Sequence, residues 1–222
     1  MHHFDEILAI AAERKGGVDA VLSGIPSPKS ADDLAAIPDD RWLAQMARGI
    51  LQAGISWKVV DSKWPDIEEA FHGFDIGFLT FQPDDWFYDL CEDKRVIRSP
   101  PKLRAILDNA AFIRRVSAEA GSFGRKIGDW PAEDFASLLQ WLQKEGARLG
   151  GATGPYALRQ MGKESYILSQ DVTARLIAEG VIDKAPTSKK AWDAVQAAFN
   201  TWRAESGQSL TTISRVLAQS IG

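Results

Sequence analysis

The chain has 222 residues, of which 45% are hydrophobic and 25% are charged, and its formal net charge is −4. This length and hydrophobic fraction suffice for a sizeable core, in one domain or in two closely packed lobes. The single cysteine, Cys91, excludes an internal disulfide and a cysteine-cluster metal site. No apolar stretch reaches membrane-spanning length, and the first residues lack the long apolar run of a secretory leader. We therefore expect a cytoplasmic protein that does not enter a membrane.

Basic residues are concentrated in the middle of the chain. Residues 91–163 hold 13 of the 26 lysines and arginines but only 8 of the 30 acidic residues. DNA responds to the local field of a protein, so this distribution is compatible with a nucleic-acid partner despite the negative net charge. Ordinary scatter of charges explains it equally well.

Helical periodicity dominates the chain, and no stretch shows the strict alternation of a half-buried strand. Apolar residues at helical spacing follow prolines or capping residues in most segments. We expect helices over residues 4–15, 38–51, 61–71, 83–90, 100–113, 131–146, 155–162, 171–179, 187–202 and 210–221. The sequence thus predicts an all-α protein of about ten short helices.

The most informative stretch is the glycine-dense turn Leu-Gly-Gly-Ala-Thr-Gly at 149–154. It separates two expected helices, 132–148 and 155–162, in the pattern of a helix-hairpin-helix. Glycines let the backbone approach a ligand closely, and successive amides beside a helix N-terminus can bind a phosphate oxygen. Taken alone, the same pattern also describes an ordinary helix C-cap followed by a loop.

A lone carboxylate, Asp171, follows this turn by one short helix and one loop. An aspartate that precedes a helical run is usually an N-cap. Near a phosphate-binding turn it can instead stabilise positive charge that develops on a sugar, and both roles can hold at once. Arg175, one helical turn later, is placed to orient that carboxylate or to contact DNA.

The run from Leu149 to Leu176 resembles the helix-hairpin-helix DNA glycosylase superfamily. Further motifs are similar to the DNA-3-methyladenine glycosylase I family: Gln-Ala-Gly-Ile-Ser-Trp at 52–57, Phe-His-Gly-Phe-Asp at 71–75 and Lys-Leu-Arg-Ala-Ile at 102–106. The resemblance spans about residues 39–176. It implies a two-lobed helical architecture for one glycosylase-like unit of residues 1–222, in which residues 132–176 carry the hairpin and the catalytic aspartate.

The resemblance implies a monofunctional DNA glycosylase that flips an alkylated purine, 3-methyladenine first among them, and hydrolyses its N-glycosidic bond in base excision repair. Superfamily members with lyase activity place a lysine on the helix after the hairpin. That position here reads Pro155-Tyr156-Ala157, so no lyase activity is expected. The implied partner is double-stranded DNA with damaged bases, bound by a monomer.

The resemblance also implies a role for individual residues. Trp57 leads the base pocket, because a tryptophan face attracts a cationic base. Without the motif, Trp57 and Ile55 would both be interpreted as core residues. The implied roles are catalysis for Asp171; base pocket for Trp57, Trp42, Phe74 and Ser56; intercalation for Gln52 and Ile55; and DNA backbone contacts for Gly150, Gly151, Gly154, Arg148 and Arg175.

The chain departs from the family at two places. The family holds a structural zinc with two cysteines and two histidines, whereas Val172 and Leu176 stand here where the C-terminal ligands would lie. We therefore expect no metal site and no required cofactor, apart from a monovalent cation that the superfamily implies at the hairpin. Gly49 replaces a pocket glutamate of the family, so base recognition must differ or use another group, such as Asp61 or a backbone carbonyl.

Three alternatives to this interpretation stay open. The first is a non-catalytic helix-hairpin-helix DNA-binding protein, and the second is a glycosylase for a different damaged base. Outside nucleic-acid chemistry, it is an unrelated helical enzyme whose glycine loop only caps a helix.

Overall fold

The computed structural model describes residues 1–221, and its regular secondary structure over that range is entirely helical. This confirms the prediction of an all-α protein. No described helix combines the length and the apolar character needed to cross a bilayer.

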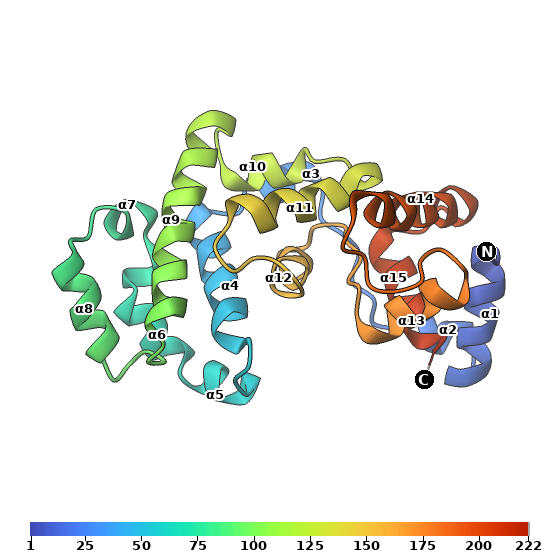
Figure 1. The fold of residues 1–222 in the computed structure, drawn as a ribbon, viewed down its shortest axis with the longest axis horizontal. Helices are drawn as coiled ribbons and strands as arrows, with labels where there is room; N and C mark the ends of the chain where they lie inside the picture. Colours follow the sequence, from blue (N-terminus) through green and yellow to red (C-terminus); the bar gives the residue numbers. More distant parts are fainter. Residues whose placement is uncertain (222) are drawn as a thin grey trace. The chain divides into compact units, whose positions relative to one another are not determined.

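The chain divides into two compact units, each assembled from segments that are not contiguous in sequence (Figure 1). The central unit consists of Ser30–Asp129 and Leu139–Met161. The terminal unit consists of Met1–Lys29, Trp130–Leu138 and the residues from Gly162 onward. Each unit is described by itself below.

The central unit is built around one long amphipathic helix, α4. Its helices are α3 (Ala31–Ala35), α4 (Asp39–Gln52), α5 (Trp57–Ser62), α6 (Trp64–Ala70), η1 (His72–Phe74), α7 (Ile76–Leu79), α8 (Asp84–Glu92), α9 (Pro100–Ala120), α10 (Phe123–Gly128), most of α11 (Phe135–Glu145) and α12 (Thr153–Met161). Apolar residues recur along α4 at the helical period, including Leu43, Met46 and Ile50, and all three are buried. That face packs in the core with α9, and α4 also packs against α12.

One expected helix, 61–71, is two helices in the structure. The chain breaks at Lys63, between α5 and α6, and Pro65 occupies the first turn of α6. A proline lacks the amide that would continue the preceding helix, but it fits a first turn, where that amide has no intrahelical partner. Helix α5 also begins earlier than expected, at Trp57.

The terminal unit joins the first and last helices of the chain. Its helices are α1 (Phe4–Lys15), α2 (Val18–Leu22), η2 (Ala132–Asp134), the start of α11, α13 (Gln170–Ala178), α14 (Lys189–Ser206) and α15 (Leu210–Gln219). Helices α1 and α15 pack against each other although they lie near opposite ends of the sequence (Figure 1). In the core, Tyr166 stacks on Phe199 with ring centroids 4.3 Å apart, and Phe135 meets Tyr166 edge-on at 4.9 Å.

A buried polar network fastens α13 in this unit. Arg175 donates from Nε to Ser220 Oγ at 2.7 Å, from Nη2 to the Ser220 carbonyl at 2.6 Å and from Nη1 to Glu179 at 3.2 Å. Glu179 also accepts a hydrogen bond from the His2 amide at 2.7 Å and contacts the His2 ring. All three nitrogens of Arg175 are therefore engaged, and the prediction that it contacts DNA or orients Asp171 is wrong.

The environment of Glu179 makes this network dependent on pH. Burial alone would raise the pKa of the Glu179 carboxyl, but hydrogen bonds from His2 and Arg175 outweigh it and lower the pKa below its ordinary value. A carboxyl whose pKa is lowered by folding stabilises the protein above the ordinary glutamate pKa. That contribution is lost as the pH falls through the lowered value.

Glu179→Gln should lower the free energy of unfolding by about 3 kcal/mol at pH 7, because it leaves Arg175 buried beside an uncharged partner. The difference from the wild type should narrow in acid, where the wild type loses the same charge. Urea unfolding followed by circular dichroism at several pH values measures both effects. Glu205→Gln is the control, since Glu205 pairs with the exposed His3 ring and should cost less than about 1 kcal/mol. Equal losses in the two variants would contradict the assignment.

Candidate functional site

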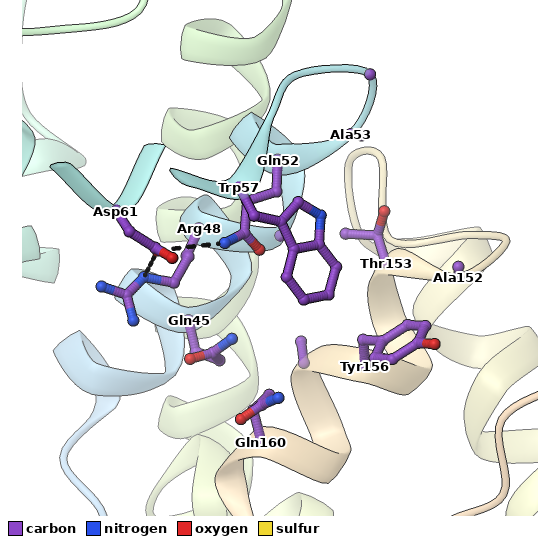
Figure 2. A pocket seen from close by; sticks show the side chains of 13 residues that line it. Gln45, Arg48, Gln52, Ala53, Trp57, Asp61, Ala152, Thr153, Tyr156 and Gln160 are labelled. Atoms are coloured by element: carbon purple, nitrogen blue, oxygen red, sulfur yellow. Dashed lines mark hydrogen bonds and ion pairs between the residues drawn. The ribbon is translucent and has the colours of Figure 1, made fainter. Parts of the chain in front are cut away.

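A cavity of about 440 Å³ opens in the central unit between α4, α5 and α12. Two of its walls repeat the same helical spacing, because side chains at i, i+3 and i+7 share one face of a helix. The residues at that spacing are Gln45, Arg48 and Gln52 on α4, and Thr153, Tyr156 and Gln160 on α12 (Figure 2). The two faces are polar, opposite in character to the apolar faces that build the core.

Two exposed aromatic side chains line the cavity. Trp57 is 56% exposed and Tyr156 is 38% exposed, and their rings meet edge-on with centroids 6.3 Å apart. Figure 2 shows both rings turned toward the cavity from α5 and α12. Large aromatic rings are normally buried, so two of them exposed at one cavity offer flat faces on which a planar ligand can stack.

One wall of the cavity carries a carboxylate that is paired with a cation. Asp61 lies 3.7 Å from Nε of Arg48 and accepts a hydrogen bond from the Gln52 amide at 3.4 Å. The Arg48 guanidinium also lies over the Trp64 ring, 4.4 Å from its centroid. Among the described residues that line the cavity, Asp61 is the acid and Arg48 the cation, so their formal charges cancel.

Gly49 marks the close approach of α4 to α12. A Cβ atom at Gly49 would lie 3.2 Å from Cγ2 of Thr153, tighter than ordinary van der Waals contact. The glycine therefore lets the two walls come together, and a larger side chain there would have to push Thr153 aside. Among the described residues that line the cavity, the carboxylate comes from α5, as Asp61, and not from position 49, where the resemblance implies a glutamate.

The loop between α4 and α5 is fixed by a lysine from α9. Lys102 donates from Nζ to the carbonyls of Leu51 at 3.1 Å and of Ala53 at 2.6 Å, which satisfies acceptors at the C-terminal end of α4. Burial, and secondarily the positive charge of Arg148, lower the pKa of Lys102. The loop presents Ile55 half-buried and Ser56 exposed. Gln52 lines the cavity, whereas Ile55 and Ser56 lie beside it in sequence but outside its lining.

The glycine-dense turn joins α11 to α12 in the same unit. Asn109 of α9 holds it by donating to the Ala147 carbonyl and accepting from the Ala147 amide, each at 2.9 Å. Arg148 and Gly151 adopt left-handed conformations with φ of +57° and +59°, and both are exposed. Since Arg148 is not a glycine, its conformation is uncommon and must be held by the surrounding turn.

Gly154 serves a packing role rather than the predicted contact with DNA. Its amide donates to the Leu149 carbonyl at 3.1 Å, and a Cβ atom there would lie 2.3 Å from the same oxygen. Only glycine fits this position, and its amide is already engaged inside the turn. For Gly150 and Gly151, the other two glycines of the turn, contact with DNA stays a prediction.

Two residues predicted to line the base pocket lie in the core instead. Trp42 is 1% exposed and packs edge-on against Phe123 at 5.6 Å. Phe74 is fully buried between Phe71 and Trp64, with ring centroids 5.1 and 5.5 Å away. Neither lines the cavity, because burying such large apolar rings stabilises the unit more than exposing them would.

Asp171 lies in the terminal unit, exposed in the first turn of α13. It is not the N-cap: Ser169 takes that position, and its Oγ accepts from the Val172 amide at 3.2 Å. The interpretation of Asp171 as a cap is therefore wrong. Within residues 1–221 its carboxylate makes no hydrogen bond or ion pair, and it lines a second concavity of the unit.

The terminal unit does not provide the donor set of a zinc site. Val172 and Leu176, at the positions where the resemblance implies ligands, are both buried apolar residues. Among the described residues, no three histidine, cysteine or acidic side chains are grouped so that they could hold a metal. The residues present do not fit the zinc of the family.

Sequence reasoning missed several residues that line the cavity, among them Gln45, Arg48, Tyr156 and Gln160. The motifs of the resemblance include none of these four as pocket residues. The signal was present, since Thr153, Tyr156 and Gln160 repeat at the spacing of one helix face.

Comparison with known proteins finds similarity both in fold and, over part of the chain, in sequence. The chain resembles 3-methyladenine DNA glycosylase I from Staphylococcus aureus with 20% identity and a TM-score of 0.51, over 69% of this chain and 91% of that one. It also resembles a Methanocaldococcus jannaschii 8-oxoguanine glycosylase/lyase, solved with a 15mer DNA containing 8-oxoguanine, over 96% of this chain and 95% of that one, with 11% identity and a TM-score of 0.54. At these identities the two structures show a shared fold. Residues 38–134 match the sequence model of the methyladenine glycosylases, so this part of the chain is similar to that family.

Proposed function

We propose that this protein is a monofunctional DNA glycosylase that removes 3-methyladenine and similar alkylated purines from double-stranded DNA. The observation that carries the proposal is the cavity whose α4 and α5 walls lie within the region of the family match and whose lining includes the exposed rings of Trp57 and Tyr156. Its volume of about 440 Å³ lies in the range of small-ligand sites.

The chemistry of the lining suits an alkylated purine. A purine methylated on a ring nitrogen carries positive charge, and the face of Trp57 attracts a cation as well as stacking on the base. Asp61 adds a carboxylate with free acceptor capacity at the cavity wall, because an ionised carboxylate has about four lone-pair sites. Gln45 and Gln160 add amides that can donate and accept, and they reach into the cavity from facing helices.

This set of groups replaces the single glutamate that the family carries at the position of Gly49. In our proposal Asp61, although paired with Arg48, offers an acceptor to the cationic base, while the amides of Gln45 and Gln160 recognise the edge of the base. The base must leave the duplex to enter such a cavity, since its reacting atom is inaccessible in the stack. Gln52 and Ile55 lie on the loop beside the cavity and fill the gap that the base leaves.

Asp171 supplies the charge for the chemical step. As the N-glycosidic bond breaks, its electron pair leaves with the base and the sugar becomes oxocarbenium-like. The free carboxylate of Asp171 stabilises that positive charge and orients the water that adds to the sugar. The proton that this water loses passes to the carboxylate or to solvent. The turn with Arg148, Gly150 and Gly151 holds the strand, and a monovalent cation at this turn would assist it.

A direct test treats a methylated duplex with the protein, identifies the released base by mass, and then cleaves abasic sites with alkali. Release of 3-methyladenine with strand breaks after alkali is the expected result. Release of another base would instead establish a different lesion, which the replacement of a glutamate by Gly49 makes the second candidate. Binding without any release would establish the non-catalytic alternative.

Asp171→Asn should reduce single-turnover excision by at least about 100-fold, because a neutral amide cannot stabilise the developing positive charge. Its melting temperature should stay unchanged, since the wild-type carboxylate makes no internal contact among the described residues, and its affinity for undamaged DNA should not fall, since the variant removes a negative charge. Asp183→Asn removes an equal charge from another exposed position of the same unit and serves as control. Excision at the control rate would remove Asp171 from the mechanism.

Trp57→Ala should lower kcat/KM for excision by about 10- to 100-fold, the equivalent of one lost base-stacking contact. Affinity for undamaged duplex should change little, because the ring meets only an extruded base. The matched control is Val59→Ala, an exposed residue of the same helix that does not line the cavity. A parallel loss of undamaged-DNA binding would assign Trp57 to general DNA contact instead.

Borohydride should trap no covalent adduct between the protein and a cleaved duplex, because the helix after the hairpin begins Thr153-Gly154-Pro155-Tyr156 and offers no lysine for a Schiff base. Gel electrophoresis of the treated mixture measures this, with a known lyase as the positive control. A trapped adduct would show that the protein is bifunctional.

A further inference from the structure

In the terminal unit, Asp171 shares a concavity with two basic side chains. A concavity of about 420 Å³ is lined by Asp171 together with Lys15 from the end of α1 and Arg215 from α15. Both basic side chains are exposed, and among residues 1–221 neither forms an ion pair. The carboxylate and the two cations thus share one surface without neutralising one another through direct contact.

This arrangement differs from the arginines that pair locally elsewhere in the protein. Arg95 pairs with Asp93 and Glu69, Arg125 with Asp32 and Asp129, and Arg203 with Glu133 and Glu164. Arg215 has Asp171 in the same concavity, yet the two are not within ion-pair distance. The concavity therefore keeps a net positive charge that no described residue satisfies.

The framework that presents these cations is rigid. Helix α15 buries Ile213, Val216 and Leu217, which leaves Arg215 on its opposite, exposed face. Gln219 donates to the Val21 carbonyl at 3.0 Å and so ties α15 to the segment of α2. Lys15 ends α1 just before Gly16, whose φ of +89° stops the helix. A lysine there also suits the helix dipole, but that effect does not account for Arg215.

We propose that Lys15 and Arg215 bind the DNA phosphates adjacent to the nucleotide whose sugar meets Asp171. The inference rests on the proposed glycosylase function of Asp171. A nucleotide carries phosphates on both sides of its sugar, so a carboxylate that approaches the sugar also repels those phosphates. Cations beside the carboxylate offset that repulsion and leave the carboxylate itself free to face the sugar.

The test measures how the affinity for duplex DNA depends on salt. Lys15→Gln, Arg215→Gln and the double variant are compared with the wild type by fluorescence anisotropy between 50 and 200 mM salt, a range in which phosphate contacts dominate the change in affinity. Each lost phosphate contact should reduce the slope of log K against log salt by about 0.9, and the double variant by about twice that. Single-turnover excision by the same variants is measured at saturating protein, which separates the loss of binding from any effect on the chemical step.

Arg14→Gln and Lys184→Gln are matched controls, since each removes one exposed positive charge of the same unit outside the concavity. Their slopes should stay at the wild-type value. Slopes for the Lys15 and Arg215 variants equal to those of the controls would overturn the inference, as would an unchanged slope with a collapsed excision rate. Thermal melting of every variant identifies any loss of fold. Lys15→Arg and Arg215→Lys keep the positive charge and should therefore retain the wild-type dependence of affinity on salt.

The two proposals fail in different ways. If the wild type binds DNA but releases no base, the glycosylase function fails, while the slope comparison still tests the phosphate contacts. If the wild type excises bases and the variants keep its slope, only the role of Lys15 and Arg215 fails.

Discussion

The close packing of α4 against α12 is the constraint on which the cavity depends. It is possible because Gly49 has no side chain to meet Thr153, and because Gly154 allows the turn to fold back on the Leu149 carbonyl. Because the two helices lie this close, the polar residues that repeat along α4 and along α12 line the same cavity. The glycine at position 49 and the shape of the cavity are thus linked, and the carboxylate of the lining comes from α5, as Asp61.

The terminal unit positions an exposed carboxylate, that of Asp171, which makes no contact of its own with the described residues. Asp171 depends on α13 for its position, and α13 is fastened by the buried contacts of Arg175 with Ser220 and Glu179. A buried ion pair is weak evidence for net stability, but it fixes one arrangement, because any other leaves its charges unpaired. Here the pair also ties α13 to the backbone of His2. This network therefore fixes the position of α13 through contacts with both the first and the last few residues of the unit.

The sequence predicts the helices better than it predicts which way their side chains face. Periodicity places α1, α4, α8 and α15 within a few residues, because buried faces must recur every 3.6 residues. The same periodicity put Trp42 on the apolar face of α4, and assigning it to the pocket from the resemblance contradicted that evidence. The prediction for Arg175 was wrong for another reason. Its partner Ser220 is 45 residues away in sequence, and local spacing carries no information about such contacts.

Helix boundaries caused the remaining error, at Asp171. The N-cap of α13 lies at Ser169, two residues before Asp171, which makes the aspartate a first-turn residue, and sequence rarely fixes a boundary that closely. The shift matters chemically, because a capping carboxylate would be bound to backbone amides and would be a weaker acceptor for new charge.

Charge explains how a chain with a net charge of −4 can be proposed to act on a polyanion. The cavity of the central unit balances Asp61 with Arg48, so a cationic base meets aromatic faces and a carboxylate without facing an excess of positive charge. In our proposal the concavity of the terminal unit must attract phosphates. Its lining meets this need, because the two positive charges of Lys15 and Arg215 outnumber the one negative charge of Asp171. Since exposed charges farther away than about 8 Å are largely screened at physiological salt, each surface acts through its own groups. The acidic residues elsewhere then set the net charge without deciding what either surface can bind.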